Sequence, residues 1–221
     1  MADRDFKVAR SRMVKTQIIA RGVRDHNVLS ALNSVPRDIF VEDALAAKAY
    51  SDFPLPIGYR QTISQPYIVA LMTESLELKK TDRVLEVGTG SGYQTAILSM
   101  LVSWVYTVER IPNLMDNAKK ILTSHNYLNI SYKVANGAEG WKEFAPYDAI
   151  MVTAGAPPDI PKPLLHQLNE GGRMVIPAGE RGNQLLLKIT RNRKNYTQEI
   201  LTGCRFVDLI GKHAWQDNIT N

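Results

Sequence analysis

The sequence predicts an α/β fold with a mostly parallel seven-stranded sheet, helices on both faces of the sheet, and an N-terminal helical extension. Three observations support this prediction. From residue 82 onward, short β-branched runs alternate with helical stretches, an order typical of parallel strands joined by helices. One run, 84–87, passes directly into the glycine-rich turn 88–92. Two further strand-like runs follow near the C-terminus and complete the sheet.

The length of 221 residues predicts one domain, with an N-terminal helical and substrate-loop subdomain at 1–80 and an α/β core at 81–221. An apolar stripe from Phe6 to Ile18 predicts a first helix that ends at Gly22, because glycine commonly follows the last helical residue. Asp25 predicts the N-cap of a second helix, which stops before a proline.

Further helices are expected over 39–49 and 67–76, with a long loop rich in proline and glycine between them. In the core, the expected strands are 83–88, 104–109, 130–134, 147–153, 172–177, 184–190 and 196–209. The expected helices of the core are 93–102, 113–125 and 161–169. Ligands of such a sheet bind at the carboxyl ends of its strands. The basic run 188–194 is interpreted as a solvated hairpin turn.

The turn Gly88-Thr89-Gly90-Ser91-Gly92 lets backbone approach a ligand closely, because glycine has no Cβ. A dinucleotide turn has the spacing G-x-G-x-x-G, but here the third glycine comes one residue early. This spacing favours S-adenosylmethionine (SAM) over a dinucleotide. Glu109 ends the next strand, where a carboxylate can accept both ribose hydroxyls of an adenosine, although a surface or helix-capping carboxylate would give the same pattern.

Asn136-Gly137 follows the third strand of the core, where a short polar side chain can meet an adenine edge or simply form a turn. No His, Asp or Glu cluster has recognisable metal-ligand spacing, and the four histidines are scattered, so no metal is expected. The fourth strand of the core also lacks the Asn/Asp-Pro-Pro-aromatic signature of enzymes that methylate amino groups of nucleic acids.

The composition bounds the environment of the protein. A single cysteine, Cys204, excludes a disulfide framework within the chain, and the charged N-terminus has no apolar segment of a secretory signal. These features predict a cytoplasmic protein that binds no membrane. The net charge of +5 is a mild excess, without the concentrated basic face and interleaved aromatics of nucleic-acid binding. A monomer is expected.

Seven segments, in order along nearly the whole chain, resemble protein-L-isoaspartate O-methyltransferases. They are 35–41, 49–58, 61–74, 84–98, 105–110, 147–157 and 168–179, of which QTIS-x-P at 61–66 is the most diagnostic because generic SAM enzymes lack it. The resemblance implies a Rossmann-like class I SAM-dependent methyltransferase. It also implies the activity: methylation of the α-carboxylate of isoaspartyl residues in damaged proteins, followed by succinimide formation and repair, with S-adenosylhomocysteine as the second product.

The resemblance assigns roles to particular positions. Ser64 matches the family's active-site serine, while Thr62 and Ile63 would help to close over cofactor and substrate. The methionine-binding loop corresponds to Glu86, Gly88, Thr89, Gly90, Ser91 and Gly92, the ribose acid to Glu109, and the adenine contact to Asn136 and Gly137. The substrate peptide is expected in a groove walled by this serine loop and by 152–156.

Three positions depart from the family pattern, and three alternative functions stay open. Arg60 stands where glycine is common, Asn136 replaces a usual aspartate, and Asp208 replaces a proline. The alternatives are a SAM methyltransferase acting on a small molecule or RNA, an NAD-binding oxidoreductase, and a methyltransferase-like fold that only binds protein partners. The order of the last strands is also open, between the common methyltransferase order and an altered one associated with this family.

Overall fold

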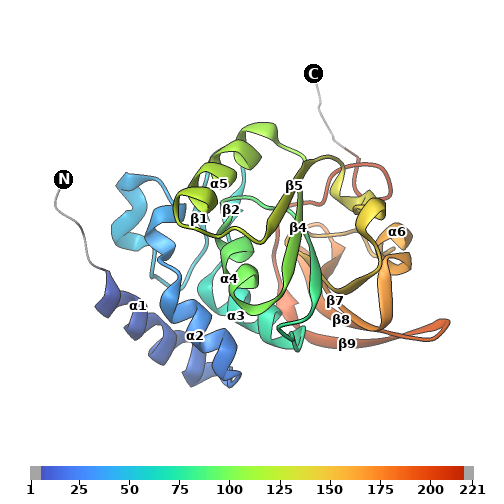
Figure 1. The fold of residues 1–221 in the computed structure, drawn as a ribbon, viewed down its shortest axis with the longest axis horizontal. Coiled ribbons are helices and arrows are strands. Elements are labelled where there is room, and N and C mark those ends of the chain that lie inside the picture. The colour runs from blue at the N-terminus through green and yellow to red at the C-terminus, as the bar shows by residue number, and fades with distance from the viewer. Residues whose placement is uncertain (1–5, 217–221) are drawn as a thin grey trace.

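A computed structural model of the chain, shown in Figure 1, describes residues 6–216. Its main sheet has seven strands, as the sequence predicts. Their order is β5-β4-β3-β6-β7-β8-β9, so the last strands, whose order the sequence left open, lie side by side in chain order. The first five strands of this order are parallel, and β8 and β9 continue as an antiparallel meander in chain order. The strands of this sheet are β3 (Arg83–Val87), β4 (Trp104–Glu109), β5 (Ile130–Val134), β6 (Tyr147–Val152), β7 (Leu168–Glu180), β8 (Asn183–Asn192) and β9 (Asn195–Cys204).

Helices cover both faces of the sheet, because successive strand residues point to opposite sides. One face packs against α3 (Pro66–Ser75), α4 (Tyr93–Leu101) and α5 (Pro112–Ser124) through the strand residues Val84, Val105 and Met151. The other face packs against α6 (Lys162–His166) and two 3-10 turns, Gly137–Glu139 and Lys142–Phe144.

The N-terminal extension lies at one end of the molecule, away from the long β8–β9 hairpin (Figure 1). The first helix runs through α1 (Lys7–Met13), a π-helical segment (Val14–Ile18) and a 3-10 turn (Ile19–Arg21) to Gly22, whose φ is +99°. Asp25 caps α2 (His26–Ser34), as predicted, by accepting from the backbone N–H groups of Asn27 and Val28. These helices share one hydrophobic core with α3, α4 and the sheet.

The helix predicted over 39–49 is wrong. Two 3-10 turns, Arg37–Phe40 and Asp43–Lys48, replace it, because the backbone is extended between them at Val41, with φ −126° and ψ 162°. A short antiparallel hairpin of β1 (Leu55–Pro56) and β2 (Thr62–Ile63) precedes α3 and carries the polar loop singled out in the sequence.

The C-terminal strands differ from the prediction in their ends. β7 begins earlier and ends later than expected, and β9 stops at Cys204 rather than continuing to residue 209. The following segment instead makes isolated bridges, in which Asp208 pairs with Gly155 and Ile210 with Trp215. The basic run 188–194 was predicted as a solvated turn, but residues 188–192 belong to β8, and only the exposed Arg193 and Lys194 form the β8–β9 turn.

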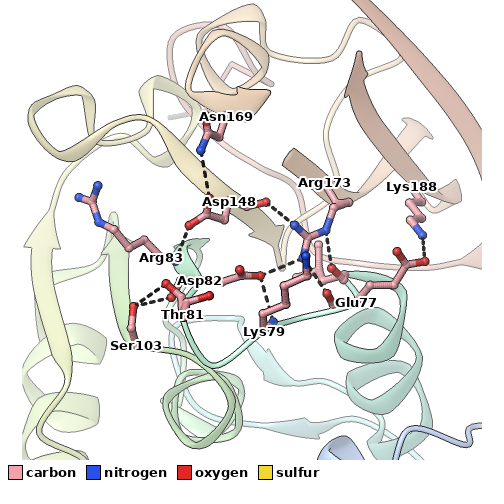
Figure 2. A network of polar contacts seen from close by, with 11 residues as sticks. Glu77, Lys79, Thr81, Asp82, Arg83, Ser103, Asp148, Asn169, Arg173 and Lys188 are labelled. Atoms are coloured by element: carbon pink, nitrogen blue, oxygen red, sulfur yellow. Dashed lines mark hydrogen bonds and ion pairs between the residues drawn. The ribbon is translucent and has the colours of Figure 1, made fainter. Parts of the chain in front are cut away.

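A polar network lies at the N-terminal ends of the strands, opposite the C-terminal ends where ligands are expected (Figure 2). Arg173 on β7 donates to the carbonyls of Leu76, Glu77 and Asp148 and forms an ion pair of 2.9 Å with Asp82. The network joins the end of α3 to the starts of β3 and β6. Among residues 6–216, no helix is long and apolar enough to cross a membrane.

Candidate cofactor and substrate site

The glycine turn lies between β3 and α4, and its backbone adopts the conformation that glycine permits. Gly88, Gly90 and Gly92 have φ angles of +96°, +54° and +89°. A Cβ on Gly88 would overlap the Thr153 hydroxyl, so backbone and the neighbouring strand end meet here without room for a side chain. A Cβ on Gly92 would instead lie 3.2 Å from Ala118 and Leu122 of α5. Gly92 therefore serves close packing of the turn against α5.

Glu109 faces the glycine turn from the end of β4. Its Oε2 accepts the Gly90 N–H at 3.0 Å, and its Oε1 accepts the Ile111 N–H at 3.0 Å. Each carboxylate oxygen has a further acceptor direction. The two backbone bonds fix the orientation of the carboxylate, so that it can accept a pair of neighbouring hydroxyl groups.

A cavity with an empty volume of about 850 Å³, its open mouth included, lies beside this turn. It sits at the carboxyl ends of β3, β4 and β6, as expected for a parallel sheet. Its walls are formed by 61–64, 87–91, 108–110, 153–154 and 207–210, together with Val69, Met72, Tyr93, Gln94 and Gly137. The cavity is of the size that small-molecule and cofactor sites have.

Most of the site residues expected from the sequence line this cavity. They are Thr62, Ile63, Ser64, Gly88, Thr89, Gly90, Ser91, Glu109 and Gly137. The remaining three, Glu86, Gly92 and Asn136, do not line it. Gly92 packs toward α5, Glu86 accepts hydrogen bonds from two threonine hydroxyls, and Asn136 supports neighbouring backbone.

Glu86 is fully buried beneath the turn. It lies one residue before the end of β3, on the face covered by α4, and its Oε2 accepts hydrogen bonds of 2.6 Å from Thr95 and Thr107. The Thr107 hydroxyl is also 2.6 Å from that of Thr89, so this chain of hydroxyls reaches the glycine turn. Burial raises the pKa of Glu86 to about 8, against the two threonine hydrogen bonds, which lower it.

Asn136 caps the 3-10 turn Gly137–Glu139 by accepting from the Ala138 N–H at 3.1 Å. Its amide also donates to the Lys212 carbonyl at 3.1 Å. The side chain thus holds the C-terminal segment beside the cavity. Gly137 itself lines the cavity, and a Cβ there would meet Val87.

The C-terminal segment 207–210 is a wall of the cavity that the sequence did not predict. Asp208 forms an ion pair of 2.9 Å with Arg181, whose guanidinium stacks 4.8 Å from the Trp215 ring. The Trp215 indole N–H donates to the Gly155 carbonyl at 3.1 Å. Asp208, at a position where the family pattern has proline, therefore fastens this wall to the β7–β8 hairpin.

A second cavity adjoins the first. It is lined by Thr62, Ser64 and Thr153, which also line the cofactor-sized cavity, and by Pro54, Gln65, Ile68 and 203–207. Ser64 is partly exposed, and its hydroxyl makes no hydrogen bond within the described part of the chain. A polar side chain that borders both cavities and retains a free donor can contact a reacting group placed between them.

Two further residues escaped the sequence prediction as individual site residues. Thr153 donates to the carbonyls of Gly88 at 2.6 Å and Val87 at 3.0 Å, so it holds the start of the glycine turn. Its position at the end of β6 is the signal that could have identified it. Arg37 is completely buried and donates to the Ser64 carbonyl at 2.7 Å. No sequence pattern distinguishes a buried arginine from an exposed one.

The backbone conformation at Arg60 shows why glycine is common at this position. Tyr59 and Arg60 at the hairpin tip have φ angles of +50° and +58°, in the left-handed region that favours glycine. The Tyr59 hydroxyl accepts from the Asn113 amide of α5 at 2.6 Å, which holds the hairpin over α5. Within residues 6–216, no group of three His, Cys, Asp or Glu side chains could hold a metal ion.

Comparison with known proteins identifies relatives over almost the whole chain. The family model for protein-L-isoaspartate(D-aspartate) O-methyltransferase matches residues 9–214. A protein-L-isoaspartate O-methyltransferase of Geobacter metallireducens is 56% identical over 212 residues, which cover 96% of this chain and 98% of that protein. The corresponding protein of Syntrophus aciditrophicus is 55% identical over 218 residues, with 97% of this chain and 99% of that protein covered.

Solved structures agree. A protein-L-isoaspartate O-methyltransferase superposes with a TM-score of 0.82 at 27% identity, over 93% of this chain and 67% of that one. A β-aspartate methyltransferase of Plasmodium falciparum in complex with S-adenosyl-L-homocysteine gives a TM-score of 0.79 at 25% identity, over 91% and 98% of the two chains. By sequence and by fold, the chain belongs to the protein-L-isoaspartate(D-aspartate) O-methyltransferase family.

Proposed function

We propose that this chain transfers the methyl group of SAM to the α-carboxyl group of L-isoaspartyl residues in damaged proteins, which starts their repair through a succinimide. Family membership supports the reaction class. The observation that carries the proposal to this chain is the placement of Ser64 on the border of two adjoining cavities. One cavity has the size and glycine-lined wall for a nucleoside cofactor, and the other is lined in part by the end of β9 and the residues that follow it.

The residues around the larger cavity fit SAM, which when bound supplies an electrophilic methyl group on a sulfonium. Glu109 would accept the two ribose hydroxyls, since its orientation is already fixed by the N–H groups of Gly90 and Ile111. The backbone of Gly88 to Ser91 would lie along the methionine part, because no Cβ blocks it at either glycine. Gly137 and the segment 207–210 would form walls around the remaining part of the nucleoside.

The substrate group needs no general base from the protein. A carboxyl group with an ordinary pKa near 4 is already ionised at neutral pH. The task of the chain is therefore to position the carboxylate and to keep water from it. The free Ser64 hydroxyl donates a hydrogen bond to this carboxylate or orients the adjoining peptide, and Thr62 forms the wall beside it.

The proposed enzyme acts as a cytoplasmic monomer on isoaspartyl proteins and peptides and binds neither membranes nor nucleic acids. Both cavities are lined by residues of one chain, so the proposed site needs no residue of a second subunit. Its location is supported by the single cysteine, which permits no disulfide within the chain.

The decisive experiment uses SAM with a radiolabelled methyl group and two synthetic peptides that differ only in the linkage of one aspartyl residue. We expect base-labile labelling of the isoaspartyl peptide and none of its normally linked twin. Equal labelling of the two peptides would contradict the proposed specificity, and transfer to RNA or a small molecule in their place would point to another methyltransferase.

Ser64→Ala tests the assignment of the serine. Removing a hydrogen-bond donor aimed at a reacting oxygen costs about 2.7–4 kcal/mol, so the kcat for the isoaspartyl peptide should fall roughly 100-fold or more. The affinity for S-adenosylhomocysteine, measured by calorimetry, should stay unchanged. Ser124→Ala, at an exposed serine that ends α5, is the matched control and should keep full activity. An unchanged kcat in Ser64→Ala would remove this role from Ser64.

A further inference from the structure

Arg37 is the largest completely buried side chain of the described residues, and it carries a charge. Burial lowers its pKa to about 10, partly offset by the neighbouring tyrosines 93 and 50, so the guanidinium remains a cation at neutral pH. Within residues 6–216 no carboxylate forms an ion pair with it, and its Nη1 has no hydrogen-bond partner. Burying such a group is costly. Close packing alone would be served at lower cost by an apolar side chain of similar volume.

The guanidinium connects three segments that are distant in the sequence. Its Nε donates to the Ala49 carbonyl and its Nη2 to the Ser64 carbonyl, each at 2.7 Å. Its face stacks 4.9 Å from the ring of Tyr93, which is the first residue of α4 and directly follows the glycine turn. The Arg37 backbone N–H donates to the Tyr50 hydroxyl at 3.2 Å, which fixes the start of the side chain as well.

These contacts define a spacing inside the site. Ser64 is held by its carbonyl, which leaves its hydroxyl free, and the glycine turn is held through the first residue of the helix that follows it. A guanidinium is planar, and its donors form a rigid fork. It can therefore fix the distance between the Ser64 backbone and the first turn of α4 in a way that a flexible side chain cannot.

We propose that Arg37 is a positioning residue for methyl transfer, which sets Ser64 against the glycine turn and so places the substrate carboxylate in line with the methyl group. This inference rests on the function proposed above. Arg37 touches neither cavity and acts only through Ser64 and Tyr93. Placement errors of about 1 Å can lower a rate roughly 100-fold, so the loss of this spacer should lower kcat strongly.

The test compares Arg37→Lys, Arg37→Met and a matched control, Arg83→Lys. Arg83 also stacks on a tyrosine, Tyr106, at 5.2 Å and donates to a backbone carbonyl, that of Phe144. It lies, however, at the N-terminal ends of the strands, away from the site (Figure 2). We expect kcat for the isoaspartyl peptide to fall about 100-fold in both Arg37 variants and to stay unchanged in Arg83→Lys. The affinity for S-adenosylhomocysteine should change less than threefold in every variant.

Two readouts separate positioning from a merely structural role. In a chain with ¹³C at the Ser64 carbonyl, the NMR signal should shift in Arg37→Lys, because a charge-assisted hydrogen bond is lost or altered. In Arg37→Ala, guanidinium at millimolar concentration should raise kcat at least tenfold. Urea, which is neutral and of similar shape, should leave kcat unchanged. A rate that recovers equally with both additives, or with neither, would overturn the positioning role.

The outcomes also distinguish the two proposals. Wild-type chain that fails to methylate the isoaspartyl peptide would overturn the proposed function, and this inference with it. Active wild type together with a normal kcat in Arg37→Lys would overturn the inference alone. If Arg37→Met does not fold, the lysine variant and the rescue experiment still decide the question.

Discussion

At the scale of single residues, the site contains two glutamates with different surroundings. Glu109 is held by two backbone N–H groups and lines the cavity, whereas Glu86 is buried under the turn with one oxygen, Oε1, that has no partner. Burial raises the pKa of Glu86 from its ordinary value near 4.5 to about 8. Glu86 is therefore protonated in the folded protein at neutral pH, and its role is to hold Thr95 and Thr107 in place.

This assignment predicts how stability depends on pH. Between about pH 4.5 and pH 8, folded Glu86 keeps a proton that the unfolded chain releases, so its contribution to stability falls as pH rises and levels off above pH 8. Glu86→Gln removes this dependence. The free energy of unfolding of the variant relative to wild type should therefore increase with pH, by at most about 1.4 kcal/mol per pH unit.

Urea unfolding at several values between pH 5 and pH 8.5 measures this difference. Glu199→Gln, at an exposed glutamate on β9, is the control and should differ from wild type by a constant amount. A Glu86→Gln curve that runs parallel to wild type over the whole range would show that Glu86 is ionised in the fold.

The same two residues show what a sequence can reveal about a site. Glu109 could be predicted because it ends a strand, and strand ends of a parallel sheet face the ligand. Glu86, which was expected in the methionine-binding loop, lies one residue before the end of β3, and its side chain is buried on the face of the sheet that α4 covers, where Thr95 of α4 donates to it. Which helix covers that face depends on the tertiary structure. Arg37 was not predicted as a site residue, because its acceptors, Ala49 and Ser64, are brought to it only by folding.

At the scale of elements, the alternating strands and the capped helices were predictable because their signals are local. The bounds of β4 and β5 agree with the prediction, and Gly22 ends the first helix. The segment 39–49 was not predictable in this way. Its sequence suits a helix, but the chain is extended at Val41, and the Ala49 carbonyl is bonded to Arg37 instead of continuing a helix. Tertiary contacts override weak local preference there.

The N-cap of α2 allows an element-scale prediction. The Asp25 carboxylate accepts the N–H groups of Asn27 and Val28 at 2.8 and 3.1 Å. Asp25→Ala should lower the free energy of unfolding by about 1 kcal/mol, because these donors lose their partner. Asn27→Ala, at an exposed position in the same helical turn, should change it by less than about 0.5 kcal/mol. Equal losses in the two variants, measured by urea unfolding, would contradict the role of the cap.

At the scale of the whole molecule, the C-terminal and N-terminal ends of the strands have different roles. The glycine turn, Glu109 and both cavities lie at the C-terminal ends of the strands. The network around Arg173 lies at their N-terminal ends, and its partner Asp82 is also nearly buried (Figure 2). This separation predicts that the network contributes to stability without direct influence on methyl transfer. It also explains why the fold follows from the strand pattern, while the network, built by residues far apart in sequence, does not.

Asp82→Ala tests this separation. The substitution leaves the Arg173 guanidinium without its carboxylate in a nearly buried place, so the free energy of unfolding should fall by about 3 kcal/mol. The control is Glu77→Ala, which removes the ion pair to Lys188, where the glutamate is 68% exposed, and should cost less than about 1 kcal/mol. Far below the unfolding temperature, both variants should keep the wild-type kcat. A strong loss of kcat in folded Asp82→Ala would show instead that the two ends of the strands are coupled through β3 and β6.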